Sequence, residues 1–348
     1  MAASAQLKAL ATLSARLGRD PLTTQAAGGN TSLKQDGALW IKASGTWLAE
    51  ADARDIFLPV ALAPLRAAIA ANDERAAKAT DFVIAADNPL GLRPSVETSV
   101  HAVFPFAAVL HVHCIETVTH AVRIDAEASI AARLAAQSGI VHVHIPYLKP
   151  GLPLARAIAA VAPPDTNVVT LGNHGLIVAA DTVEEAGLLL ERVAKALASP
   201  ARPAPPADLA ALAALAEGSD WRLPSDPAAH AIATDPERLA IARGGSLYPD
   251  HVVFLGSAVA VLPEGMPPSA FESRATIPQM LLAIPGKGVL IHRAVLRGGD
   301  DLARALAEVT GRLGEDQPLR VLTEAEELEL FNWDAEIYRR ALAKVPEA

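Results

Sequence analysis

Residues 167–197 read NVVTLGNHGLIVAADTVEEAGLLLERVAKAL, and this stretch decides the fold class. Two short apolar runs rich in Val, Ile and Leu flank the turn Gly172-Asn173-His174-Gly175, a pattern typical of two strands around a loop. After them, residues 184–197 carry apolar side chains every three or four positions, which predicts an amphipathic helix. Strands combined with covering helices indicate a layered α/β domain.

The same mixture extends toward the N-terminus. The first helix is predicted from leucines that recur at helical spacing: Leu7, Leu10, Leu13 and Leu17. Because Lys8 and Arg16 interrupt this apolar stretch, we interpret it as a core helix and not as a signal peptide. Further strands are expected at 38–43, 55–60 and 107–113, and a helix at 64–71. No run of 18 apolar residues occurs, so the sequence predicts a cytoplasmic protein with no membrane-spanning helix.

Composition changes most sharply at residues 199–218, SPARPAPPADLAALAALAEG. A stretch rich in Pro and Ala predicts a linker that runs into a short helix. We therefore expect a first domain at 1–198, a linker at 199–239 and a second, smaller α/β domain at 240–348. In that last part, strands are expected at 252–255, 258–262 and 289–292, and helices at 300–313 and 324–345.

Composition also excludes several classes of protein. With 348 residues, 51% hydrophobic and 20% charged, the chain has ample material for a core and is not disordered. Its net charge of −9 and the lack of a long basic run argue against a nucleic-acid partner. Cys114 is the single cysteine, which excludes an intramolecular disulfide and a thiolate zinc cluster. Any metal ion must therefore be held by histidine and carboxylate.

His111 and His113 are two positions apart on an expected apolar strand. Side chains at that spacing share one face of a strand, so both imidazoles can reach one ion. The alternative is a pair of half-buried histidines satisfied by hydrogen bonds. A second such pair, His142 and His144, has the same local pattern, and only the other motifs that accompany the first pair favour His111 and His113 as the metal ligands.

Two further residues accompany the pair His111 and His113. His174 lies in a Gly-Asn-His-Gly turn that follows an expected strand, and Glu97 lies at the start of an expected helix. Three imidazoles with an open coordination position are typical of a catalytic metal site. A neighbouring carboxylate acts there as a base or a fourth ligand. The alternative for Glu97 is helix capping alone. His101 follows Glu97 by one helical turn, a spacing that allows it to share that face, and a packing role is the favoured interpretation for it.

Residues 27–32, AGGNTS, predict a loop whose backbone N–H groups form a nest for an anion. Ser44-Gly45-Thr46, after Lys42, is a second candidate, and Ser95 a third. The alternative for each is an ordinary turn that binds no ligand, because glycine, asparagine and serine are common in turns. Together they suit a phosphate or carboxylate on a small-molecule substrate.

In combination, GGNTSLK, LWIKASGTWLA, PSVETSVH, VLHVHCIETV and GNHGLIV resemble the class II aldolase/adducin family, in collinear order over residues 6–197. The resemblance implies a three-layer α/β/α fold and a homo-oligomer, a tetramer or dimer. It implies a divalent ion, usually Zn2+, held by His111, His113 and His174, with Glu97 as catalytic base. It also assigns substrate or phosphate binding to Gly29, Asn30, Thr31, Ser44, Gly45 and Ser95.

The C-terminal part resembles longer members related to the aldolase part of bifunctional rhamnulose-phosphate aldolase/dehydrogenases. Two departures stand out. Aldolases of the family carry Ser-Ser-Glu where this chain has Ser95-Val96-Glu97, and the tyrosine that protonates the leaving aldehyde has no match between His113 and residue 140. Tyr147 is the nearest tyrosine, but the motif does not align it with that role.

The expected function is a metal-dependent lyase of carbohydrate metabolism. It would cleave a C–C bond through a metal-stabilised enediolate on a small hydroxy-carbonyl substrate, with or without a phosphate. Epimerases and decarboxylases use the same intermediate and stay open as alternatives. So do another metal enzyme built on the three histidines and a non-catalytic adducin-like scaffold.

Overall fold

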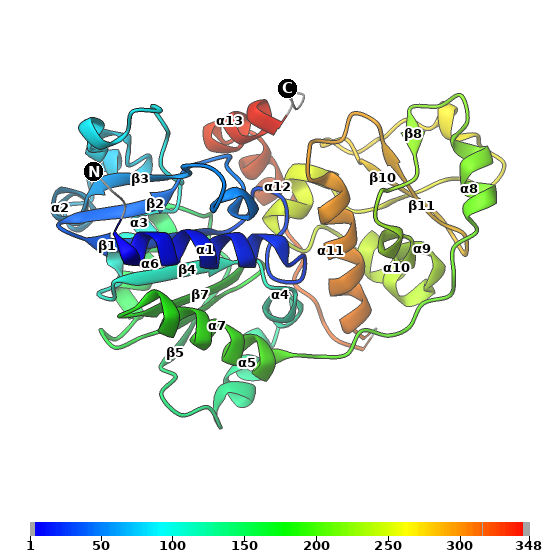
Figure 1. The fold of residues 1–348 in the computed structure, drawn as a ribbon. Helices are drawn as coiled ribbons and strands as arrows, with labels where there is room; N and C mark the ends of the chain where they lie inside the picture. The colour runs from blue at the N-terminus through cyan, green and yellow to red at the C-terminus, as the bar shows by residue number, and fades with distance from the viewer. Residues whose placement is uncertain (1–3, 315, 344–348) are drawn as a thin grey trace. The chain divides into compact units, whose positions relative to one another are not determined.

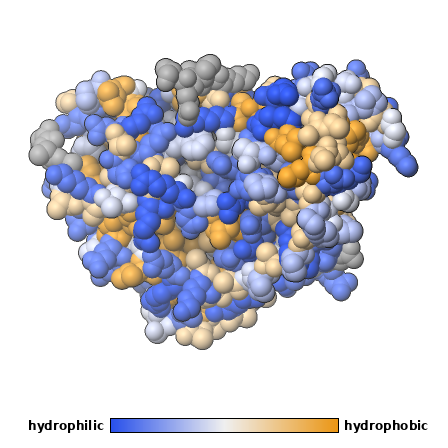
Figure 2. Space-filling model, turned by 45° about the vertical axis from the view of Figure 1, so that its right-hand side comes forward, coloured by the Kyte–Doolittle hydropathy of each residue, from blue (hydrophilic) through white to orange (hydrophobic). Residues whose placement is uncertain are grey.

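The computed structural model describes residues 4–314 and 316–343, which form two compact units. The first comprises residues 4–117 and 127–198, and the second comprises 118–126 and the residues from 199 onward. Among the described residues, no helix is long and apolar enough to cross a membrane. Hydrophilic residues cover most of the face in Figure 2, and hydrophobic residues appear there in small separate groups.

The first unit is built on a seven-stranded sheet with the order β3-β2-β1-β4-β7-β6-β5 (Figure 1). Its neighbouring strands are antiparallel except for the parallel pair β5–β6. The strands are β1 (Asn30–Gln35), β2 (Ala38–Lys42), β3 (Phe57–Ala61), β4 (Ala108–Val112), β5 (His142–Ile145), β6 (Val168–Leu171) and β7 (Gly175–Ala180). The expected strands at 38–43, 55–60 and 107–113 correspond to β2, β3 and β4.

Helices cover both faces of this sheet. Alternate residues of β1 show the two sides, because the Thr31 hydroxyl bonds Ser14 on α1, while the Ser32 hydroxyl bonds His101 on α3. On the α1 (Ala5–Arg19) side, α7 (Val183–Leu197) packs against α1, β4 and β7 (Figure 1). On the other side lie α2 (Leu62–Ala70), α3 (Thr98–Val103) and α6 (Leu152–Val161). The unit is therefore a three-layer α/β/α domain, as expected.

The core on the α3 side joins β4, β6 and β7 to α3 and α6. Its buried members include Val109, Val169 and Ile177 from the sheet and Val100 and Leu154 from the helices. Two shorter helices, α4 (Ile115–Ala121) and α5 (Ala126–Leu134), follow β4. Because the core fixes the strands, it also fixes the loops at their ends.

The second unit holds a four-stranded sheet with the order β8-β11-β10-β9. The strands are β8 (Trp221–Arg222), β9 (Ala260–Val261), β10 (Leu281–Ile284) and β11 (Gly288–His292). The helices are α8 (Leu209–Ala216), α9 (Ala231–Thr234), α10 (Pro236–Arg243), α11 (Gly299–Arg312), α12 (Glu324–Phe331) and α13 (Asp334–Ala343). A second α/β region of this kind agrees with the expected fold class.

Three expectations for this region differ from the structure. Residues 252–255 do not form a strand but lie in a π-helical turn at His251–Leu255, all of it buried. The single helix expected at 324–345 is broken into α12 and α13, and Val345 lies outside the described residues. Within the stretch 199–239, α8 is the short helix expected at the end of 199–218, but β8 and α9 were not expected. Leu212 and Trp221 of this stretch pack in a core with Leu282 and Leu290, so it is not only a linker.

Candidate metal centre

Three histidines converge where β4 ends. His111 lies on β4, His113 directly follows that strand, and His174 lies in the turn between β6 and β7. Their ring centroids are 4.8 to 5.1 Å apart, and one ligand nitrogen from each lies within 4.8 Å of the others. His111 and His174 are buried, with 1% and 6% of their surface exposed, and His113 is partly buried. This arrangement is able to hold a metal ion.

Strand register brings these rings together. β4 pairs with β7 so that Val112 opposes Leu176, and β6 pairs with β7 so that Leu171 opposes Gly175. The three-residue turn between β6 and β7 therefore lies beside the end of β4. Asn173 in this turn has a φ of 52°, a left-handed conformation that asparagine tolerates better than most residues. The turn places the His174 ring against the two rings from β4.

Glu97 adds a buried carboxylate to the three rings. It is the N-cap residue of α3, but its side chain makes no capping hydrogen bond, so the capping alternative is wrong. Glu97 Oε2 lies 3.4 Å from His111 Nε2 and accepts a hydrogen bond of 2.8 Å from Asn30 Nδ2. Glu97 Oε1 lies 3.9 Å from His174 Nε2.

The environment keeps this carboxylate ionised. Burial by itself raises the pKa of Glu97, but the adjacent His111 and His174 and the hydrogen bond from Asn30 outweigh it, so that the pKa falls to about 2. A buried anion beside three convergent imidazoles is a donor set that suits a divalent cation. The described residues therefore fit the ion that the sequence implies.

The second histidine pair has different partners. His142 and His144 lie on the edge strand β5, and both rings bond the hydroxyl of Thr170 on β6, at 2.8 and 3.0 Å. Burial lowers the pKa of both rings, to about 4 for His142. These two histidines have hydrogen-bond partners within the sheet, as expected for half-buried strand residues.

The loops predicted to bind an anion are partly brought together. Ala43 bridges Pro94, the Ser44 N–H donates to the Arg93 carbonyl, and the Ser95 N–H donates to the Lys42 carbonyl. The buried Lys42 ammonium in turn donates to the carbonyls of Ala27 and Gly29. The segments that contain Gly29, Ser44, Gly45 and Ser95 therefore lie beside Glu97.

Two details of those loops differ from expectation. β1 begins at Asn30, so residues 30–32 are strand and not loop. Thr31 is fully buried and its hydroxyl lies 2.7 Å from that of Ser14, on the sheet face opposite Asn30 and Ser32. Its side chain therefore does not join the other predicted substrate-binding residues. The side-chain amide of Asn30 bonds Glu97 and His101 instead of pointing to solvent.

His101 and Ser32 contact the residues of this site. The sequence analysis favoured a packing role for His101 and did not consider Ser32. The signal was present in the spacing, since His101 follows Glu97 by one helical turn and Ser32 follows Asn30 by two strand positions. Nothing in the sequence alone showed that the two elements face each other.

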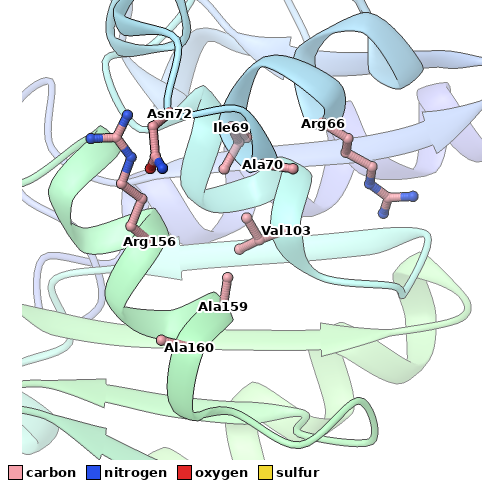
Figure 3. A pocket seen from close by; sticks show the side chains of 8 residues that line it. All are labelled: Arg66, Ile69, Ala70, Asn72, Val103, Arg156, Ala159 and Ala160. Atoms are coloured by element: carbon pink, nitrogen blue, oxygen red, sulfur yellow. The ribbon is translucent and has the colours of Figure 1, made fainter.

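A cavity of about 440 Å3 lies elsewhere in this unit, among α2, α3 and α6 (Figure 3). Its two arginines lie on opposite sides, and each contacts an acceptor of this chain. Arg66 donates to the carbonyls of Ala102 and Phe104 at the end of α3, and Arg156 lies 3.3 Å from Glu74. The remaining lining is Ile69, Ala70, Asn72, Val103, Ala159 and Ala160, which offers no metal ligand set or nucleophile.

The model of the family described as Class II Aldolase and Adducin N-terminal domain matches residues 8–199. The chain belongs to the class II aldolase and adducin family. The match ends close to the end of the first unit, and it includes the three histidines and Glu97.

Among curated proteins, "Uncharacterized oxidoreductase YuxG" of Bacillus subtilis (strain 168) is 28% identical over 183 residues, 48% of this chain. The chain spans only 25% of the length of that relative. A solved N-terminal class II aldolase domain of a conserved protein from Thermoplasma acidophilum is 24% identical, with a TM-score of 0.49, covering 57% of this chain and 94% of that one. An L-fuculose-1-phosphate aldolase from Thermus thermophilus is 17% identical, with a TM-score of 0.35, covering 54% and 92%.

Proposed function

We propose that the chain is a metal-dependent lyase that cleaves a C–C bond in a small hydroxy-carbonyl substrate. The observation that carries this proposal is the convergence of His111, His113 and His174 with the ionised carboxylate of Glu97. Members of the family without catalytic activity, the scaffold alternative, have no need to bury a carboxylate among three imidazoles, since such a site costs stability.

The three histidines would hold the ion, which we propose to be Zn2+. A divalent ion bound there supplies a Lewis acid that polarises the carbonyl and hydroxyl oxygens of the substrate. Imidazole nitrogens suit zinc, and three protein ligands leave a coordination position open.

Glu97 would hold and move the proton through Oε1. Asn30 Nδ2 occupies Oε2, whereas Oε1 accepts no hydrogen bond from a described residue and is buried on the His174 side. In retro-aldol cleavage, a base removes the proton of the substrate hydroxyl, the C–C bond breaks, and its electrons form an enediolate and leave an aldehyde. Glu97 Oε1 would accept that proton and return it to the enediolate carbon, which gives the ketone product and restores the carboxylate.

Substrate binding is assigned to the loops beside Glu97. The backbone around Gly29 and Asn30, the turn at Ser44-Gly45 and the Ser95 hydroxyl would bind the anionic or hydroxyl end of the substrate. We also propose that the protein works in the cytoplasm, in carbohydrate metabolism, as a homo-oligomer, as the family resemblance implies.

The test is metal content together with cleavage. Purified protein without a histidine tag should contain about one zinc per chain, and His111→Ala should lose it while the variant remains folded by circular dichroism. Glu97→Gln should keep the zinc and lose cleavage of a panel of ketoses and ketose phosphates by at least about a hundredfold, since general-base catalysis typically contributes that much. Stoichiometric zinc in His111→Ala would contradict the assignment of the metal ligands. Undiminished cleavage by Glu97→Gln would contradict the assignment of Glu97 as the base.

A further inference from the structure

Glu97 is held by a chain of buried side chains that starts away from the histidines. Ser32 and Asn30 point to the same face of β1, toward α3, where His101 lies one turn after Glu97. The Ser32 hydroxyl contacts His101 Nδ1 at 2.7 Å, His101 Nε2 contacts Asn30 Oδ1, and Asn30 Nδ2 contacts Glu97 Oε2 at 2.8 Å. All four residues are at most 5% exposed.

One assignment of hydrogens satisfies every hydrogen bond in the series Ser32–His101–Asn30–Glu97. The Asn30 amide nitrogen faces Glu97 Oε2 and donates to it, because an amide nitrogen only donates, so the amide oxygen faces His101 and only accepts. His101 Nε2 must then carry the ring proton, because it has to donate to that oxygen. Burial lowers the pKa of His101, so the ring is neutral and carries a single proton. Nδ1 is then unprotonated and accepts from the Ser32 hydroxyl. The reverse tautomer would set a nitrogen lone pair against the Asn30 oxygen.

We infer that His101 and Ser32 are positioning residues for Glu97, acting through Asn30. They hold the Asn30 amide so that it donates to Glu97 Oε2, which keeps Glu97 Oε1 on the side of His174. Both residues reach the Glu97 carboxylate through the Asn30 amide, so they are not catalytic residues. This inference rests on the proposed function only where it gives Glu97 a proton to move.

Burial explains why the chain matters. His101 is 0% exposed, so water cannot replace its hydrogen bond to Asn30 without opening the core between β1 and α3. Without that donor the buried Asn30 oxygen is left without its His101 partner, so the amide that donates to Glu97 is held at one end only. A base that is displaced or disordered in this way loses rate even though the metal ligands are intact.

The first experiment measures the tautomer, and it needs no substrate. Full-length protein labelled with 15N-histidine is compared with His101→Gln, which identifies the His101 signals in two-bond 1H–15N NMR spectra. We expect His101 to carry its proton on Nε2, with and without added Zn2+, and Ser32→Ala to populate both tautomers. A wild-type His101 protonated on Nδ1 would overturn the inference.

The second experiment separates positioning from structure. His101→Leu removes the donor, whereas His101→Gln restores an N–H at the position of Nε2, and His142→Gln, on the edge strand β5, is the control. Activity is deuterium exchange into dihydroxyacetone and dihydroxyacetone phosphate in D2O. We expect His101→Leu to keep its zinc, lose kcat by roughly 10–100-fold with KM little changed, and His101→Gln to regain most of it.

Equal kcat in His101→Leu and wild type, or no difference between the Leu and Gln variants at equal zinc content, would contradict the inference. If the wild-type protein exchanges neither compound nor cleaves any ketose, the proposed function fails instead. The tautomer of His101 then decides the inference by itself.

Discussion

Gly175 is the residue on which the spacing of the histidines depends. A methyl group there would meet the Val112 carbonyl oxygen at 2.5 Å and the rings of His113 and His111 at 3.3 and 3.4 Å. We therefore predict that Gly175→Ala separates β7 from β4 and displaces both rings, which costs about 1–3 kcal/mol of stability and weakens zinc binding.

Thermal unfolding and zinc titration against a chromophoric chelator measure the two effects. Gly314→Ala is the matched control, because a methyl group there meets nothing closer than 3.8 Å. Zinc affinity in Gly175→Ala equal to that of the control would show that the close approach does not govern the site.

We predict that His251 makes the stability of the protein depend on pH. The ring is fully buried near Tyr248, and burial lowers its pKa from 6.5 to about 4. Above pH 6.5 the ring is neutral in both the folded and the unfolded chain. As the pH falls, the unfolded chain binds the proton first, so stability decreases from pH 6.5 to about 4, by about 3 kcal/mol from this ring.

His251→Asn tests this prediction, since its amide oxygen replaces Nδ1 as the acceptor for the Leu247 N–H. Denaturant unfolding at pH 7 and pH 4.5 should show a smaller loss of stability in the variant than in the wild-type protein. An equal loss in both proteins would assign the pH dependence to other groups.

At the scale of single residues, the sequence predicted what depends on local spacing. His111 on β4 and His113 directly after it are two positions apart, and His174 lies in a turn between two apolar runs. The bond from Asn30 to Glu97 joins residues 67 positions apart and depends on how β1 lies against α3. No local pattern contains that information.

At the scale of elements, the errors have a common physical origin in tertiary packing. Residues 30–32 have loop-forming composition, but they pair with β4 across Asn30 and His111 and become strand. Residues 252–255 form a short continuous apolar run, which periodicity alone cannot assign to a strand or a helix. The break between α12 and α13 falls at Asn332 and Trp333, where apolar spacing continues but the helix ends.

The helix α7 was predicted correctly from its local apolar spacing, and the structure adds a local capping signal at its start. Thr182 caps it, and a capping box joins the Thr182 hydroxyl to the Glu185 N–H and the Glu185 carboxylate to the Thr182 N–H. We predict that Thr182→Ala costs about 1 kcal/mol, while Thr182→Ser, which keeps the acceptor, costs clearly less.

Chemical denaturation gives the free energies, and amide exchange in the first turn of α7 locates the effect. Glu185 is exposed and Thr182 is only partly buried, so loss of core packing contributes little to the comparison. If the alanine and serine variants lose the same stability, the capping hydrogen bond does not stabilise α7.

At the scale of the whole molecule, the chain has two compact units, and the candidate metal ligands belong to only one of them. An ion that binds the folded state and not the unfolded state stabilises what its ligands hold together, by RT ln(1 + [L]/Kd). Zinc at roughly 100 times its Kd therefore adds about 2.7 kcal/mol to the opening of the structure that carries the site.

We predict that this stabilisation is confined to the first unit. Hydrogen exchange measured by mass spectrometry should slow, on adding Zn2+, in peptides of β4 and of the β6–β7 turn, which carry His111, His113 and His174. Peptides of β10 and β11, whose sheet and core lie entirely in the second unit, should be unchanged. In His111→Ala the effect should vanish everywhere, because two imidazoles bind zinc more weakly than three. Protection in β10 and β11 that depends on His111 would instead mean that the two units are energetically coupled through the metal.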